Sequence, residues 1–202
     1  METAYFVPWK GKNFRTTRAL ILSESAYSWT GADGKIYTPK VSHPNDSICW
    51  WIKNFENVPK RGYFISMNRA LCGTETPTSL GMTEAWNEYA YTIFVQGTVG
   101  FGARIRPSKE QWEDAKRHFR ALIEEIRPTR VIVTGKDMWN RHMEGCDGPH
   151  LSDDLQAYRL KDGSLVWCLA VPHPSNTKQG FRWELVGESI RKFRSEKLPL
   201  RD

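Results

Sequence analysis

The chain has 202 residues, 40% of them hydrophobic and 12% aromatic, which is enough to bury one core of ordinary size rather than two small ones. No stretch approaches the roughly 20 consecutive apolar residues of a membrane-spanning helix, and the start METAYFVPWKGK lacks the apolar centre of a secretion signal. We therefore expect a single cytoplasmic domain over residues 1–202, a monomer with no membrane partner.

Charge and cysteine content narrow the class of partner and cofactor. The formal net charge is +6, and nine residues are tryptophan. A basic protein rich in aromatic side chains suits a polyanion such as nucleic acid, because aromatic rings stack on exposed bases. The alternative is a mildly basic protein whose tryptophans all lie in the core. The four cysteines are widely spread and the five histidines show no ligand spacing, so we expect no metal and no cofactor.

The first predicted elements lie in the N-terminal third. The apolar run RALILS, residues 18–23, predicts a buried strand. The segment ESAYSWTGADG, residues 24–34, ends in residues that favour turns and predicts an irregular loop. Ser47 then predicts the N-cap of a helix whose apolar residues recur at helical spacing, and Pro59 predicts its end.

The rest of the chain alternates between strands and helices. Residues 89–96 (YAYTIFVQ) predict a strand, since they are rich in aromatic and β-branched residues. The clearest helix lies within residues 107–128, where Ser108 and Gln111 form a capping-box pattern and Pro128 predicts the end. The later predicted elements are a strand at 130–135, a helix at 136–144, a strand at 165–171 and a helix at 183–197.

Short apolar strands that alternate with amphipathic helices predict an α/β fold, with a parallel sheet covered by helices on both faces. In such folds, ligands bind beyond the carboxyl ends of the strands. The segments expected at those ends are SESAYSW, the end of YTIFVQG, TGKDMW and PHPSN. We therefore expect the functional site along that edge of the sheet.

Taken in order, the segments LILSESAY, YTIFVQG with RIRPSKEQW, RPTRVIVTGKDMW and HPSN resemble the uracil-DNA glycosylase superfamily, from about residue 18 to about residue 195. The resemblance implies a three-layer α/β/α domain with a central, mostly parallel four-stranded sheet. It also implies an enzyme that flips a nucleotide out of double-stranded DNA and hydrolyses the bond between base and sugar, which leaves an abasic site.

The HPSN segment carries the most specific part of the resemblance. The histidine of this loop donates a hydrogen bond to the departing base in the family, which implies that role for His173, held rigid by Pro172 and Pro174. The alternative is a stiff turn with His173 merely exposed. The residues expected to contact DNA phosphates are Ser175, Asn176, Lys178, Arg182, Arg104 and Arg106.

The first motif departs from the common uracil enzymes, in which an aspartate positions the attacking water. The series here is Glu24, Ser25, Ala26 and Tyr27, and a serine cannot act as a base at neutral pH without help. Glu24 precedes this serine, just as an acid precedes a non-acidic residue in the iron–sulfur branch, and it can orient water or offset the positive charge on the sugar. The four cysteines lack the paired spacing of that branch, so we expect no cluster. The alternative role of Glu24 is an ion pair with a nearby arginine.

Ser25 is expected in the base pocket. Tyr27 matches a ring that screens the pyrimidine 5-position, or else lies in the core.

The end of the second strand departs as well. Many members place an asparagine there to read the base edge, whereas this chain has Ile93, followed by Phe94. Without that amide, discrimination between uracil and cytosine loses its usual hydrogen bonds. Phe94, Trp50 or Trp51 can stack on the extruded base, although core packing suits each of them too.

These departures favour a glycosylase for a modified pyrimidine, such as a glucosylated cytosine of phage DNA, in anti-phage defence. Two alternatives stay open. One is a uracil or deaminated-base glycosylase of base-excision repair that uses Glu24 in place of the aspartate. The other is a DNA-binding module that keeps the fold and has lost catalysis.

Overall fold

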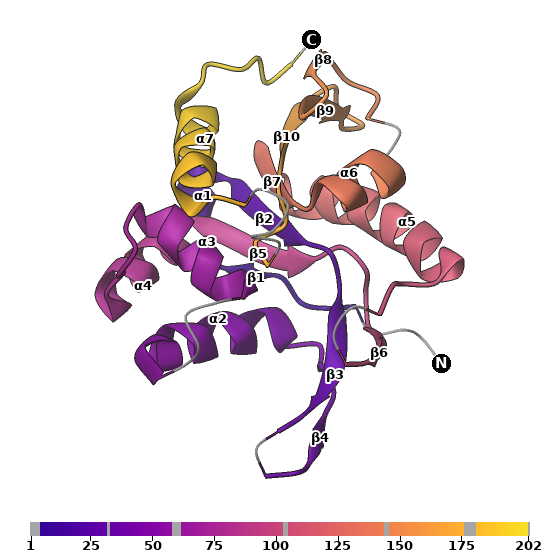
Figure 1. Ribbon diagram of the computed structural model, residues 1–202. Helices are drawn as coiled ribbons and strands as arrows, with labels where there is room; N and C mark the ends of the chain where they lie inside the picture. Colours follow the sequence, from indigo (N-terminus) through magenta and orange to yellow (C-terminus); the bar gives the residue numbers. More distant parts are fainter. Residues whose placement is uncertain are drawn as a thin grey trace.

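A computed structural model describes residues 5–31, 33–57, 62–102, 105–143, 146–175 and 181–201, and it has an α/β architecture (Figure 1). The strands are β1 (Trp9–Lys10), β2 (Ala19–Ser23), β3 (Ala26–Thr30), β4 (Ile36–Tyr37), β5 (Tyr89–Ile93), β6 (Thr98–Phe101), β7 (Arg130–Thr134), β8 (His150–Ser152), β9 (Leu155–Arg159) and β10 (Leu165–Val171). The helices are α1 (Phe14–Thr17), α2 (His43–Asn54), the 3-10 helix η1 (Phe55–Asn57), α3 (Tyr63–Cys72), α4 (Ser79–Asn87), α5 (Lys109–Ile126), α6 (Lys136–His142) and α7 (Trp183–Ser195). Among the residues described, no helix is both long and apolar enough to cross a bilayer.

The large sheet has seven strands in the order β1-β5-β2-β7-β10-β9-β8. The pairings that link β5, β2, β7 and β10 are parallel, whereas β1 and the pair β9 and β8 add antiparallel strands at the two edges. The α/β class is confirmed, and the expected four-stranded sheet is corrected to a mixed sheet of seven strands. The edge strands β1 and β8 are short and largely exposed, so their sequences carry no apolar run that predicts a strand.

Helices cover both faces of this sheet (Figure 1). Along β2, Leu20 and Leu22 pack into the cluster that includes α5 and α6, while Ala19 and Ile21 pack into the cluster that includes α2, α3, α4 and α7. Successive side chains of a strand point to opposite faces. All four residues are 1% exposed or less, so β2 is buried on both faces, which is why it reads as a continuous apolar run.

Helix α5 begins as its sequence predicts. The backbone N–H of Gln111 donates to the Ser108 hydroxyl at 3.2 Å, and the Ser108 N–H donates to the Gln111 side chain at 2.9 Å, which completes the capping box. Arg127 caps the other end in a left-handed conformation with a φ of 49°. The predicted apolar face is buried, and its residues are Trp112, Ala115, Phe119, Leu122 and Ile126.

Two predictions in the N-terminal third are corrected. Residues 24–34 are not an irregular loop, because β3 pairs with β4 in a hairpin and with β6 in parallel, and this small sheet extends away from the helices in Figure 1. Helix α2 begins at His43 rather than after Ser47, with Ser42 at its N-cap. Pro44, whose fixed φ suits a first helical turn, favours the earlier start. The predicted end at Pro59 lies outside the described residues.

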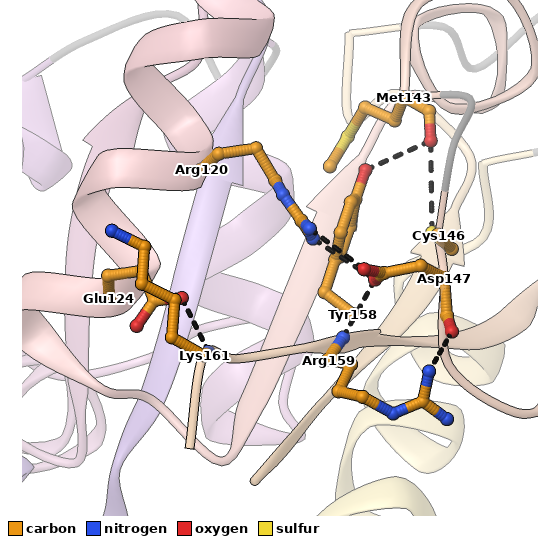
Figure 2. Close-up of polar contacts among 8 residues, drawn as sticks. All are labelled: Arg120, Glu124, Met143, Cys146, Asp147, Tyr158, Arg159 and Lys161. Atoms are coloured by element: carbon orange, nitrogen blue, oxygen red, sulfur yellow. Dashed lines mark hydrogen bonds and ion pairs between the residues drawn. The ribbon is translucent and has the colours of Figure 1, made fainter. Parts of the chain in front are cut away.

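Polar contacts join the β8–β9 extension to α5 (Figure 2). Arg120 of α5 forms a two-point ion pair with Asp147 at 3.2 and 2.9 Å. Asp147 also accepts the backbone N–H of Arg159 in β9 at 2.9 Å. The Tyr158 hydroxyl donates to the Met143 carbonyl at 2.9 Å, and the Arg120 guanidinium lies 5.1 Å from the centroid of the Tyr158 ring. These contacts hold the antiparallel edge of the sheet against the neighbouring helix layer.

Candidate active site

The carboxyl ends of β2 and β10 bring Glu24 and His173 to the same edge of the sheet. Glu24 directly follows β2, and His173 lies two residues beyond β10. One strand, β7, separates them, so the two segments leave the sheet roughly 10 Å apart, at about 4.8 Å between neighbouring strands. An acid and an imidazole therefore lie at the same edge of the sheet, on either side of β7.

Between these two residues, the sheet presents a glycine. Gly135 follows β7 with a φ of 155°, a backbone conformation that residues with side chains rarely adopt. A Cβ at this position would lie 3.7 Å from Cδ2 of His173. The His173 ring therefore packs close to the Gly135 backbone, at the end of the strand between Glu24 and His173.

The His173 ring has a defined tautomer. Its Nδ1 accepts a hydrogen bond from the backbone N–H of Ser175 at 3.2 Å, so the neutral ring carries its proton on Nε2. Burial lowers the pKa of His173, and the positive charge of Arg106 lowers it further. The ring is half-buried and packs on Tyr63 of α3, with 5.8 Å between ring centroids. His173 is therefore a held, neutral donor, not a merely exposed residue of a turn.

A cluster of hydroxyl groups supports this part of the site. The Tyr63 hydroxyl lies 3.0 Å from Thr134 Oγ1 at the end of β7, and Ser23 Oγ at the end of β2 lies 2.9 Å from the Tyr91 hydroxyl of β5. Burial raises the pKa of both tyrosines, so the hydroxyls stay neutral. These contacts link β2 to β5 and β7 to α3, and Tyr63 of α3 lies against the His173 ring.

Glu24 forms an ion pair with Arg106. Nη1 of Arg106 lies 3.0 and 3.1 Å from the two carboxylate oxygens of Glu24, and Nη2 lies 3.2 Å from Asp137 Oδ2. The Glu24 side chain is 14% exposed. Burial raises the pKa of Glu24, the Arg106 charge and hydrogen bond oppose the rise, and the Asp137 charge adds to it. The arginine pair that was the alternative for Glu24 is therefore present, at the same edge as His173.

The other polar candidates are spread around this edge. Ser25 is half-buried in the link between β2 and β3, and Tyr27 of β3 is 39% exposed, so Tyr27 is not a core residue. Ser175 is exposed next to His173, and Arg182 is exposed at the N-cap of α7. Three expected phosphate contacts lie outside the described residues: Arg104, Asn176 and Lys178.

Most of the hydrophobic candidates lie in the core. Ile93 and Phe94 are each 2% exposed, so Phe94 presents no ring face to a ligand in this structure. Trp51 stacks on Phe64 of α3 with 5.7 Å between ring centroids. Trp50 is 50% exposed on α2. Phe94 is therefore a core residue, and Trp51 is partly buried against the core. Of the three candidate stacking residues, Trp50 is the most exposed.

Three residues of the site were not predicted from the sequence: Gly135, Asp137 and Tyr63. Gly135 and Asp137 lie in TGKDMW, a segment already expected at the ligand-binding edge, so a signal for them was present. Tyr63 begins a helix that was not predicted, and no local motif indicates its contact with His173. Arg106 was expected to contact a phosphate, whereas it contacts two carboxylates here.

No protein-family model matches the chain, and no curated protein matches it either. Within the described residues, no three side chains of His, Cys, Asp or Glu gather closely enough to hold a metal ion.

Proposed function

We propose that this protein is a DNA glycosylase that extrudes a modified pyrimidine nucleotide from double-stranded DNA and hydrolyses the bond between base and sugar. The observation that carries the proposal is the arrangement of Glu24 and His173 on opposite sides of Gly135. In this reaction, negative charge develops on the departing base and positive charge on the sugar. An acid and a hydrogen-bond donor at opposite ends of the scissile bond stabilise those two charges.

His173 acts on the departing base. Because Nδ1 accepts the Ser175 N–H, the proton on Nε2 is the one offered to a base oxygen. The lowered pKa of His173 keeps the ring neutral near pH 7, so it acts by donating a hydrogen bond rather than by carrying a charge. A donor already held in place needs no reorganisation when the base leaves, which makes it more effective than a mobile one.

Glu24 acts on the sugar. Its carboxylate offsets the positive charge on the sugar and accepts a proton from the attacking water as the water oxygen bonds to C1′. The electrons of the broken bond leave with the base, where the hydrogen bond from His173 stabilises them. Ser25 follows Glu24 and is half-buried. Because a serine hydroxyl does not act as a base at neutral pH without help, Ser25 can assist only by a hydrogen bond to the water or the sugar.

A modified cytosine of phage DNA suits this site better than uracil. Ile93 stands where an amide would read the base edge, and it is buried and apolar. Base selection then depends on shape and on contacts to a substituent. A bulky group such as a glucosyl residue provides that difference in shape, and the exposed Tyr27 ring is available to it. Such an enzyme acts in the cytoplasm, as a monomer, in defence against phage.

One observation favours a second candidate, a DNA-binding module without catalysis. Arg106 contacts both oxygens of Glu24, and a carboxylate that is fully engaged by an arginine is a weaker proton acceptor. In this case, the basic protein binds DNA and His173 has no chemical role.

The two candidates differ in whether abasic sites form. The protein is incubated with glucosylated phage DNA, with uracil-containing DNA and with unmodified DNA, and alkali then cleaves any abasic sites. We expect strand breaks in the glucosylated DNA alone. Breaks in uracil DNA alone would assign the protein to repair of deaminated bases. Intact DNA in all three samples, with binding retained, would assign it to the binding module.

A further inference from the structure

Arg106 lies between two carboxylates that belong to different elements. Its Nη1 lies 3.0 Å from Glu24 Oε1, next to the end of β2, and its Nη2 lies 3.2 Å from Asp137 Oδ2, in the first turn of α6. The other oxygen of Asp137 lies 2.7 Å from Nε of Arg141, one turn further along α6. Four charged side chains therefore form a continuous chain that ends at Glu24.

The backbone near Glu24, Asp137 and Arg106 is held in place by the neighbouring strands and helix. The Glu24 carbonyl accepts the N–H of Val95 at 2.9 Å, which continues the pairing of β2 and β5 past their last residues. Asp137 lies three residues beyond the end of β7. Arg106 lies two residues before Ser108, the capping-box residue of α5. The arginine therefore bridges two fixed carboxylates across the edge where the ligand is expected.

We propose that Arg106 is a positioning residue that orients the Glu24 carboxylate, and not a DNA-phosphate contact. This inference rests on the proposed function, because it names what holds the group that acts on the sugar. Both terminal nitrogens of Arg106 already donate to carboxylates, so a phosphate would have to share a guanidinium whose positive charge two acids already offset. The planar guanidinium can serve two acceptors at once, which a lysine ammonium, a point charge, does less well.

The charges around Glu24 determine whether its pKa should rise or fall when Arg106 is replaced. The charged groups that face it are Arg106 and Asp137, with Arg141 behind Asp137 and the neutral His173 ring beyond Arg106. Without the Arg106 charge, Glu24 would face Asp137 in a largely buried position with no cation between them. Both burial and a like charge favour the protonated form of a carboxylate, so the Glu24 titration should move to higher pH.

The decisive variant is Arg106→Gln, with Arg106→Lys as the conservative partner. Arg117→Gln is the matched control, because Arg117 is similarly exposed (72% against 62%) and pairs with Asp114 on its own helix. The titration of the Glu24 carboxyl is followed by NMR in the full chain without DNA, with its resonance assigned through Glu24→Gln. We expect a shift to higher pH in Arg106→Gln, a smaller shift in Arg106→Lys and none in Arg117→Gln. An unchanged titration in Arg106→Gln overturns the proposal.

Salt dependence of binding to plain duplex DNA tests the competing role. If Arg106 contacts a phosphate, Arg106→Gln lowers the slope of log affinity against log salt by about one. We expect the wild-type slope instead, and a fall of about one overturns the proposal.

The NMR measurement needs neither DNA nor turnover, so a protein that releases no base but shows the titration shift contradicts the proposed function and not this inference. An active protein with an unshifted Glu24 contradicts this inference alone.

Discussion

At the scale of single residues, the site is defined by two groups whose surroundings shift their protonation. Burial raises the pKa of Glu24 and lowers that of His173. Glu24 therefore protonates at a higher pH than an ordinary glutamate, while His173 stays neutral to a lower pH than an ordinary histidine. The pKa values of Glu24 and His173 therefore lie closer together than the ordinary values of these two residue types. Each residue has the form that acts in the reaction, the carboxylate of Glu24 or the neutral ring of His173, at pH values above its pKa.

We therefore expect the rate of base release to fall as the pH is lowered. Protonation removes the proton acceptor at Glu24, and protonation of His173 Nδ1 breaks its hydrogen bond with Ser175. The single-turnover rate is measured between about pH 4 and pH 8, in the range where these groups titrate. A rate that stays constant into the acid range would exclude both groups from the chemical step.

Glu24→Gln separates chemistry from binding. The amide keeps the shape of the carboxylate and loses its charge, so we expect slower base release with DNA affinity retained or improved, since a negative charge near phosphates is removed. Ser25→Ala is the control and should be milder, because a hydroxyl assists only by hydrogen bonding. If Ser25→Ala proves the crippling change and Glu24→Gln the harmless one, the roles of the two residues are reversed.

At the scale of elements, α5 positions the segment that carries Arg106, and its capping box gives a direct test of that support. Ser108→Ala removes the acceptor for the Gln111 N–H, and we expect it to lower the free energy of unfolding by about 1 kcal/mol. Ser189→Ala is the matched control. Ser189 lies inside α7, where alanine is the better helix former. Urea unfolding that gives equal stability for both variants would contradict this role of the cap.

The elements that the sequence predicted are those whose pattern is decided locally. β2, β7 and β10 are buried on both faces and read as apolar runs, and α5 has an apolar stripe that ends at a proline. The segment that contains β3 was predicted to be a loop because Gly31, Asp33 and Gly34 favour turns. Tyr27 and Trp29 of β3 are exposed, so β3 has no buried apolar run to indicate a strand. The Arg106–Glu24 pair joins residues 82 positions apart, so no local pattern could indicate it. The edge of the sheet was predictable, and the partners across it were not.

At the scale of the whole molecule, the charge balance predicts how DNA binds. With a net charge of +6, affinity should come largely from phosphate contacts, depend little on base sequence and fall as salt rises, because binding releases counterions. Ser175 and Arg182 are both exposed, and both are expected phosphate contacts within the described residues. Affinity for plain duplex DNA that stays unchanged between low and physiological salt would contradict this prediction.

Measuring the released base shows whether His173 takes part in breaking the bond between base and sugar. Wild type and His173→Ala are mixed in excess with glucosylated phage DNA, and the free base is quantified by mass spectrometry over a single turnover. Circular dichroism checks that the variant is folded. We expect release by the wild type and a rate that is lower by about 100-fold or more in the variant, because a preorganised donor is lost. A folded His173→Ala that releases the base at the wild-type rate would contradict it.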